Sequence, residues 1–276
     1  MKKMCADSNN DTPLISIIIL THNGLRYTKQ CIESISTHTK ENYELIFIDN
    51  ASQDQTLDFL HSIPNATVIA NSINRGFPAG CNQGFSAANG DYIVILNNDT
   101  IVTKGWLTGL IRWLEIDETI GIAGPRSNYV LKEQAVSRVA YKTKEELQIF
   151  AAQWNQTHRK QGYAVEQLSG FCMAFKKSLL RQIGGMDERF TPGYYEDTDF
   201  SLRARIAGKK LWVANDVFIH HHGSGSFKTK RKKLGKTVII NRKKFYEKWN
   251  IKNMKQINAL VKREQPFNEK RHYVPY

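Results

Sequence analysis

GDYIVILNNDT, residues 90–100, is the stretch that decides the fold, because a run of apolar and β-branched residues stops abruptly at two asparagines and Asp99. We interpret the run as a buried strand that carries a carboxylate to the ligand-binding edge of a sheet. An earlier run, YELIFIDNAS, does the same with Asp49, and a third acidic group, YYEDTDF at 194–200, follows much later. Two strand-end acids and a distant acidic pair suggest a metal-bound nucleotide and a general base.

Apolar runs alternate with segments of helical spacing. The expected strands are Leu14 to Leu20, Leu45 to Ile48, Thr67 to Ala70 and Tyr92 to Leu96, and helices are expected around Tyr27 to Ile35, Trp106 to Leu114, Lys144 to Trp154 and Thr198 to Ala207. This alternation is typical of an α/β fold with a mostly parallel sheet flanked by helices. Ligands bind beyond the carboxyl ends of such strands. The residues that should meet there are Thr21, His22, Asn23, Asp49, Asn50 and Asn97 to Asp99.

Three glycines in NRGFPAGCNQG, residues 74–84, are spaced by four: Gly76, Gly80 and Gly84. On a helix this spacing places them on one face, where the backbone can approach a strand or a ligand closely. A tightly packed helix after a loop is one reading, and phosphate or sugar contact is the other.

The composition favours a folded, enzyme-sized protein, since 41% of the 276 residues are hydrophobic. No apolar run approaches the roughly 18 residues of a membrane span, and MKKMCADSNN has no apolar signal core, so we expect a cytosolic protein. The cysteines have no CxxC spacing, which argues against a zinc knuckle or a redox pair.

The formal charge of +13 is concentrated in the segment from Lys228 to Tyr276, which has 16 Lys and Arg against three Glu, while the remainder has 23 basic and 23 acidic residues. Solvated helix faces or a mobile tail would explain such charge. The interleaved aromatic residues instead favour peripheral contact with an anionic membrane, at its inner face. We expect no nucleic-acid partner, because the body is neutral and has no motif that reads nucleic acids.

The segments IILTHN, IDNAS, NRGFPAGCNQG, LNNDT, IGGMDERF, YYEDTDFSLRARIAG and HHHGSGSF occur in this order between roughly Pro13 and Phe227. In this respect the sequence resembles the family 2 glycosyltransferases, inverting enzymes with a GT-A fold, and among them the bacterial rhamnosyltransferase-like members. The resemblance implies a GT-A-like single domain with a basic C-terminal extension. The implied parts are an N-terminal tail at 1–12, a glycosyltransferase domain at 13–227 with a nucleotide-binding half at 13–100 and an acceptor half at 101–227, and a basic helical extension at 228–276.

The resemblance assigns Asp99 to a Mg²⁺ or Mn²⁺ ion that neutralises the donor diphosphate. Asn97, where the family has the first Asp of a DxD motif, would contact the ribose or support the metal site, and it leaves fewer anionic ligands. The alternative for LNNDT is an Asx turn that ends a strand.

By the same resemblance, Asp49 accepts the imide hydrogen of uracil or thymine, and Thr21 lines that pocket. The nucleotide-binding residues are then Thr21, Asn23, Asp49, Asn74, Arg75, Asn97 and Asn98. The alternative for Asp49 is a cap on the following helix, a role that Asn50 or Ser52 could also fill.

The acidic residues Glu196, Asp197 and Asp199 precede Arg203 and Arg205 on one predicted helix, an order that the helix dipole alone would favour. An inverting transfer nevertheless needs a carboxylate that takes the proton of the acceptor hydroxyl. The resemblance assigns this catalytic role to Asp197, with Glu196 holding or orienting the acceptor.

Three consecutive histidines, 220–222, cannot converge on one ion from a strand, because neighbouring side chains face opposite sides. A solvated strand end is the usual explanation for such a run. The family segment has a histidine that contacts the metal or the diphosphate, and His221 fits that register best, with His220 second.

The resemblance therefore implies inverting transfer of a hexosyl or deoxyhexosyl group from a UDP- or dTDP-sugar to a carbohydrate or lipid-linked hydroxyl in cell-surface polysaccharide synthesis. A sugar-1-phosphate nucleotidyltransferase is one alternative, but THNGLRYTK has only Arg26 and Lys29 where a Gly-rich basic loop is required. A non-catalytic nucleotide-sugar-binding scaffold is the other, and Asn97 is the feature that favours it.

Overall fold

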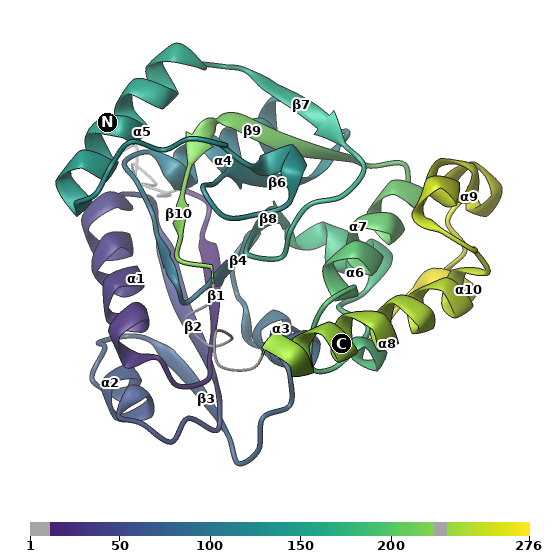
Figure 1. The fold of residues 1–276 in the computed structure, drawn as a ribbon, viewed down its shortest axis with the longest axis horizontal. Coiled ribbons are helices and arrows are strands. Elements are labelled where there is room, and N and C mark those ends of the chain that lie inside the picture. The colour runs from purple at the N-terminus through teal and green to yellow at the C-terminus, as the bar shows by residue number, and fades with distance from the viewer. Residues whose placement is uncertain (1–11, 224–230) are drawn as a thin grey trace, which may run out of the picture.

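A computed structural model of the protein describes residues 12–223 and 231–276. Residues 1–11 of the expected tail and the expected boundary after Phe227 lie outside these ranges. Figure 1 shows a central sheet with helices on both faces and a group of C-terminal helices at one side.

The central sheet has eight strands in the order β3-β2-β1-β4-β8-β6-β9-β7. Their bounds are β1 Ile15–Thr21, β2 Tyr43–Asn50, β3 Thr67–Asn71, β4 Tyr92–Asn97, β6 Ile120–Arg126, β7 Gly162–Val165, β8 Cys172–Lys176 and β9 Lys210–Phe218. Strands β3, β2, β1 and β4 are parallel neighbours, as are β6 and β9, whereas β8 and β7 run antiparallel to their neighbours. The expected α/β class with a mostly parallel sheet is confirmed.

The helices lie on both faces of the sheet and beside it. Their bounds are α1 Leu25–His38, α2 Thr56–His61, α3 Phe77–Ala87, α4 Trp106–Ile116, α5 Lys144–Thr157, α6 Lys177–Ile183, α7 Glu196–Ile206, α8 Arg231–Trp249, α9 Ile257–Glu264 and α10 Glu269–His272, with short 3₁₀ turns η1 Lys132–Gln134, η2 Glu188–Phe190 and η4 Met254–Gln256. The four helices expected from the spacing of apolar residues are therefore present as α1, α4, α5 and α7.

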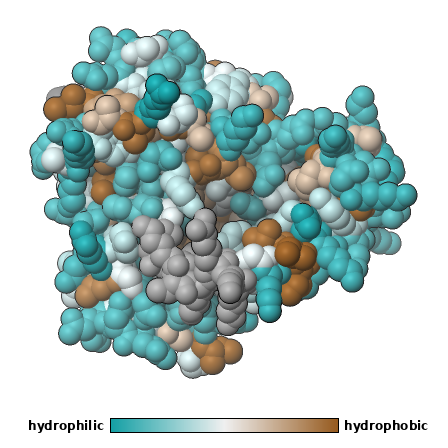
Figure 2. All heavy atoms as spheres, in the orientation of Figure 1, coloured by the Kyte–Doolittle hydropathy of each residue, from teal (hydrophilic) through white to brown (hydrophobic). Residues whose placement is uncertain are grey.

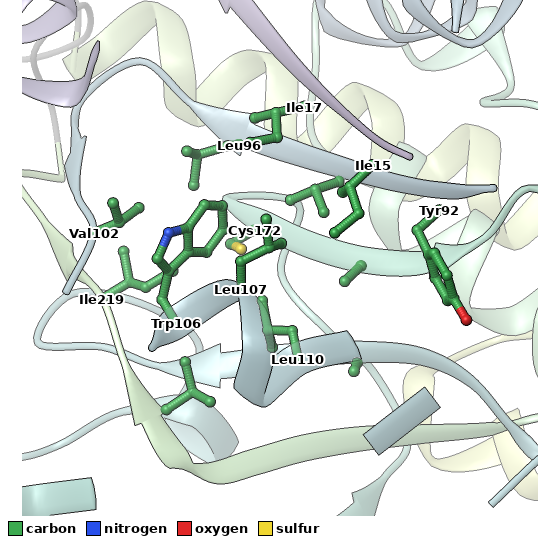
Figure 3. Close-up of a cluster of buried hydrophobic side chains, with 14 of the residues drawn as sticks. Ile15, Ile17, Tyr92, Leu96, Val102, Trp106, Leu107, Leu110, Cys172 and Ile219 are labelled. Atoms are coloured by element: carbon green, nitrogen blue, oxygen red, sulfur yellow. The ribbon is translucent and has the colours of Figure 1, made fainter. Parts of the chain in front are cut away.

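The core has two layers because side chains of a strand alternate between its faces. In β1, Ile15, Ile17 and Ile19 belong to the layer that includes residues of α1 and α4, whereas Ile18 belongs to the layer that includes residues of α3, α6 and α7. Figure 3 shows the first layer, in which side chains of α4 meet those of β1 and β4; the labelled ones include Trp106, Leu107, Leu110, Ile15, Ile17 and Leu96.

Helix α3 lies unusually close to β1 because two of its glycines face that strand. A Cβ atom on Gly80 would lie 2.6 Å from Leu20, and one on Gly84 would lie 2.4 Å from Ile18. These two glycines serve helix packing, while the third, Gly76, faces the loop at Pro192. The packing places the N-terminal end of α3 beside the acidic residues described below.

The extension packs against the body of the protein. Phe245 and Trp249 of α8 are buried with Phe190, Leu202 and Ile206, a set that belongs to η2 and α7. Phe245 and Trp249 therefore serve the packing of α8 on the body, and these two aromatic residues do not face a membrane. None of the helices within the described ranges is both long and apolar enough to cross a membrane.

Buried ion pairs hold the extension in place. The ammonium group of Lys248 lies 2.6 Å from a carboxylate oxygen of Asp199 and 2.7 Å from one of Asp187. The indole of Trp249 donates a 2.8 Å hydrogen bond to Asp199, which Arg203 also contacts at 2.8 Å. Part of the basic charge of the extension therefore compensates acidic groups of the body.

Candidate active site

The carboxyl ends of β2, β1 and β4 lie side by side at one edge of the sheet, within one residue of the same register. Thr21 is the register partner of Asp49, and Leu20 is the partner of Asn97. Because neighbouring strands lie about 4.8 Å apart, the ends of β2 and β4 are separated by about 10 Å, with β1 between them. The strand-end residues expected to share one edge of the sheet therefore do so.

Asp49 is buried at the end of β2. Its Oδ1 accepts hydrogen bonds from the hydroxyl groups of Thr21 at 2.8 Å and Ser52 at 2.5 Å, and its Oδ2 accepts one from the amide of Ser52 at 2.9 Å. Helix α2 begins only at Thr56. Its N-cap residue is Gln55, whose side chain accepts no hydrogen bond from the helix. The alternative that Asp49, Asn50 or Ser52 caps this helix is therefore wrong.

The other residues predicted to bind the nucleotide shape the surrounding loops. The Oδ1 atom of Asn23 accepts the amide of Gln53 at 2.7 Å, and that of Asn74 accepts the amide of Gly76 at 2.8 Å. The backbone amide of Arg75 donates to Asn50 at 3.4 Å. Asn98 donates from its amide to the hydroxyl of Thr28 at 2.9 Å, so this contact is with α1.

Asp99 lies beside His221, because β5 (Thr100–Ile101) and β10 (His220–His221) form a short antiparallel pair. The Nε2 atom of His221 is 3.0 Å from Oδ1 of Asp99 and 3.4 Å from the amide nitrogen of Asn97. The hydroxyl of Tyr141 lies 2.7 Å from Nδ1 of the neighbouring His220. The alternation along β10 thus brings one histidine of the run to Asp99 and turns the preceding one away.

The tautomer of His221 follows from its contacts. Its Nδ1 lies 2.8 Å from the carbonyl oxygen of Tyr129, which can only accept a hydrogen bond, so Nδ1 carries a proton. In the neutral ring, Nε2 then directs a lone pair at the carboxylate of Asp99. The lone pair of Nε2 and the carboxylate oxygen repel each other at 3.0 Å. The contact therefore requires either a second ring proton, on Nε2, or a metal ion between the two atoms.

The pair of Asp99 and His221 fits a divalent cation that also binds a diphosphate. A carboxylate oxygen and an imidazole nitrogen that lie 3.0 Å apart, as in this pair, could both hold one such ion. The described residues contain no group of three or more His, Cys, Asp or Glu side chains arranged around one ion. Because Mg²⁺ usually takes few protein ligands and completes its coordination with phosphates and water, a two-residue site is sufficient for it.

Asp197 and Glu196 form the start of α7, where Tyr195 precedes them. Asp197 accepts hydrogen bonds from the amides of Gly170 at 3.1 Å and Thr198 at 2.7 Å. Glu196 is only 6% exposed, and no hydrogen-bond partner within the described part of the chain reaches its Oε2. The predicted charge order along the helix is present, but it does not account for these different surroundings.

The surroundings set the pKa values of the two carboxyl groups apart. Burial raises the pKa of the Asp197 carboxyl, although hydrogen bonds from Gly170 and Thr198 act in the opposite direction. Burial and then the charge of Asp197 raise the pKa of Glu196 well above its ordinary value. Asp197, which has the donors, is therefore the better place for a negative charge, and Glu196 is the one that keeps its proton more readily.

Two adjacent residues connect the acidic pair with Asp99. The amide of Gly170 donates to Asp197, and the ring of the next residue, Phe171, stacks on His221 with centroids 5.1 Å apart. The carbonyl of Phe171 also accepts the amide of Asn97 at 2.8 Å. Since consecutive Cα atoms lie about 3.8 Å apart, the side chains of Asp99, His221 and Asp197 border one region of the molecule.

Several residues of this region were not predicted from the sequence. Asn128 uses its side chain to bind both backbone groups of His221, and Tyr129 supplies the carbonyl that fixes its ring. Gly170 and Phe171 precede β8, whose first residue, Cys172, pairs with Leu96 at the end of β4. Gly170 and Phe171 could have been found only by predicting that β8 pairs antiparallel with β4.

Comparisons with known proteins agree with this geometry. An uncharacterised glycosyltransferase of Haemophilus influenzae is 31% identical over 136 residues, which are 48% of this chain and 42% of that protein. The poly(ribitol-phosphate) beta-glucosyltransferase of Bacillus spizizenii is 33% identical over 106 residues, which are 36% of this chain and 16% of that protein. The chain thus spans less than half the length of these curated relatives.

Solved structures share the fold. GalNAc-T7 with UDP, GalNAc and Mn²⁺ has a TM-score of 0.63 at 16% identity, covering 93% of this chain and 58% of that one. The mannosyltransferase PcManGT of Pyrobaculum calidifontis with GDP-Man and Mn²⁺ has a TM-score of 0.63 at 17% identity, covering 92% and 70%. At such identities the likeness concerns the GT-A fold alone.

The family model described as glycosyl transferase family 2 matches residues 16–184, which is more than half of the chain and includes β1 to β8. The matched range contains Asp49, Asp99 and the Gly170–Phe171 step, while Asp197 and His221 follow it. The chain belongs to glycosyl transferase family 2.

Proposed function

We propose that this protein transfers a hexosyl or deoxyhexosyl group, with inversion, from a UDP- or dTDP-sugar to a hydroxyl of a carbohydrate or lipid-linked acceptor. In this proposal residues 13–100 bind the nucleotide and residues 101–227 the acceptor. The observation that carries it is the Gly170–Phe171 step, which joins the carboxylate of Asp197 to the pair of Asp99 and His221.

Each group then has a chemical task. Asp197 accepts the proton of the acceptor hydroxyl while the hydroxyl oxygen forms a bond to the anomeric carbon. The bond from that carbon to the diphosphate breaks, and the nucleoside diphosphate leaves with the electron pair. Attack opposite the leaving group inverts the configuration, so the base must lie across the sugar from the diphosphate.

Asp99 and His221 would hold Mg²⁺ or Mn²⁺, which supplies positive charge to the departing diphosphate when bound. The hydrogen bond from Nδ1 of His221 to Tyr129 orients the ring for this task. The side-chain amide nitrogen of Asn97 lies 3.4 Å from Nε2 of His221. Asn97 therefore places a neutral group beside Asp99 and His221 where the family has a second carboxylate. The Mn²⁺ bound to GalNAc-T7 and to PcManGT supports the same choice of metal.

The nucleotide base is assigned by Asp49. A carboxylate has about four acceptor positions, and three donors occupy part of them, which leaves about one for the imide N–H of uracil or thymine. The UDP bound to GalNAc-T7 supports a pyrimidine, whereas the mannosyltransferase PcManGT binds GDP-Man. The similarity to the poly(ribitol-phosphate) beta-glucosyltransferase supports a polymer as the acceptor.

The extension would also contact an anionic membrane from the cytosolic side. On α8 the side chains of Ile239 and Ile240 are 58% and 54% exposed, and that of Lys243 is 79% exposed. Figure 2 shows a hydrophobic patch over α8 on a largely hydrophilic surface. Exposed aliphatic residues among cations are the combination that favours an anionic bilayer, and the buried aromatic residues are not needed for it.

A ligand screen tests the donor. A UDP- or dTDP-sugar at about a hundred times its dissociation constant stabilises the fold by about 2.7 kcal/mol, which raises the melting temperature measurably. We expect this rise with Mn²⁺ and a UDP- or dTDP-sugar, and a much smaller one with a GDP-sugar or with chelator. Equal stabilisation by all nucleotide sugars would contradict the assignment of Asp49.

A further inference from the structure

We propose that Asn241 of the C-terminal extension is a positioning residue for Asp197, which it acts on through the loop at residues 190–195. The inference rests on the proposed function, because it assumes that Asp197 takes the proton of the acceptor. It gives the extension a part in catalysis that is separate from any contact with a membrane.

Asn241 holds the loop through one amide nitrogen. Its Nδ2 lies 2.6 Å from the carbonyl oxygen of Phe190, 2.9 Å from that of Gly193 and 3.2 Å from that of Tyr194. The side chain is 1% exposed, so water does not replace it there. Three carbonyl oxygens that point at one place repel each other unless a donor lies between them. The conformation of the loop therefore depends on this donor.

The loop has a backbone that needs such support. Tyr194 and Tyr195 have φ values of 72° and 77°, a region that residues other than glycine seldom adopt. Both immediately precede Glu196 and Asp197, which begin α7. Residues held in such conformations persist because their surroundings fix them. A change in the loop would therefore move the first turn of α7 and its carboxylates.

The loop is also held from the nucleotide-binding half. The amide of Phe77, the first residue of α3, donates to the carbonyl of Pro192 at 2.9 Å, and a Cβ atom on Gly76 would lie 2.9 Å from the Cα atom of Pro192. On the other side, the ring of Tyr195 packs on Phe245 of α8 with centroids 5.4 Å apart. The loop is thus clamped between α3 and α8, and Asn241 is its polar contact on the α8 side.

The test compares Asn241→Ala with Glu264→Gln. The first variant removes the donor to the loop, and the second removes a buried charge of the extension that Arg271 and His272 contact at 3.1 Å and 3.2 Å. We expect Asn241→Ala to lower kcat for transfer by about tenfold or more, because a misplacement of about 1 Å can cost about 100-fold in rate. The Kd for UDP with Mn²⁺ should stay within about twofold of wild type, since the metal site is not on the loop.

Glu264→Gln should lower the melting temperature by at least as much as Asn241→Ala while keeping kcat near the wild-type value. Hydrogen exchange of a peptide that spans residues 190–195 should quicken in Asn241→Ala only. If Asn241→Ala does not fold, Asn241→Ser, which keeps a single donor, provides the same comparison with a smaller expected loss.

Wild-type kcat in a folded Asn241 variant, or equal losses in both variants, would overturn the proposal. Either result can be told apart from a failure of the proposed function. If the proposed function itself were wrong, the wild-type protein would transfer no sugar, or Asp197→Asn would transfer it at the wild-type rate, whatever residue stands at position 241.

Discussion

The Nε2 atom of His221 lies 3.0 Å from Oδ1 of Asp99, although 122 positions separate the two residues in the chain. The contact depends on the short pairing of β5 with β10 and on the Tyr129 carbonyl that orients the ring. Asp99 and His221 would hold a divalent cation, which would supply positive charge to the diphosphate of the donor. The metal-coupled binding of a nucleotide should therefore depend on both side chains.

His221→Ala should weaken the coupling between Mn²⁺ and UDP. Loss of residues that only support a metal ligand costs about 10- to 100-fold in affinity, so loss of a direct ligand should cost at least about tenfold. Calorimetric titration of UDP with and without Mn²⁺ measures the coupling. His220→Ala is the matched control, because that ring contacts Tyr141. If UDP bound to the wild-type protein equally well without Mn²⁺, the non-catalytic scaffold would become the better account.

Asp49→Asn should change which base is bound. A hydrogen bond to a charged acceptor contributes about 1.5–3 kcal/mol, which corresponds to roughly 10- to 100-fold in affinity for UDP. An amide can present N–H donors to cytosine, so the preference for UDP over CDP should shrink as well. Competition between the two nucleotides measures the preference. A variant that is less stable but keeps the preference would show that Asp49 serves only to hold Thr21 and Ser52.

Glu196→Gln should stabilise the protein increasingly as the pH rises. A carboxyl group with a raised pKa binds its proton more tightly in the folded than in the unfolded chain. Its contribution to stability is complete below the ordinary pKa of Glu and is lost as the pH rises toward the folded-state pKa, by up to about 1.4 kcal/mol per pH unit. Glutamine does not ionise, so the Glu196→Gln variant does not lose stability in this way. Urea unfolding from about pH 5 to about pH 8 should show a growing difference, whereas a constant difference would contradict it.

Lys248→Met should loosen the extension. Removal of one partner from a buried ion pair costs about 3 kcal/mol or more, because Asp187 and Asp199 lose a compensating charge. Lys243→Met on the same helix removes a 79% exposed lysine that pairs with Glu247, and it should change the free energy of unfolding by no more than about 0.5 kcal/mol. Chemical denaturation of both variants gives the comparison, and similar effects would mean that the buried pairs do not anchor α8.

Much of the structure of residues 13–100 could be predicted from the sequence, because the patterns that determine it are local. The apolar runs before Asp49 and Asp99 mark buried strands, and parallel strands bring their carboxyl ends to one edge. Alternation along a strand also explains why the ring of His221, and not that of His220, reaches the carboxylate of Asp99. The family order of motifs then supplied roles that spacing alone left open.

The links between distant segments could not be predicted in this way. Phe171 reaches His221 only because β8 inserts antiparallel between β4 and β6, and no local pattern encodes that choice of neighbour. The apolar residues of α8 have the same spacing whether they pack on a bilayer or on Phe190, so the burial of Phe245 and Trp249 was missed. Asn241 carries no signal of its own, since its role depends on a loop far away in the chain.

The measurement that tests the account most directly is transfer by Asp197→Asn, with the donor found in the ligand screen and a hydroxyl acceptor. The substitution preserves the shape of the side chain but removes the base, so transfer should be abolished while the Kd for the nucleotide with Mn²⁺ stays nearly unchanged. A variant that transfers sugar at the wild-type rate would remove Asp197 from the mechanism and contradict the account.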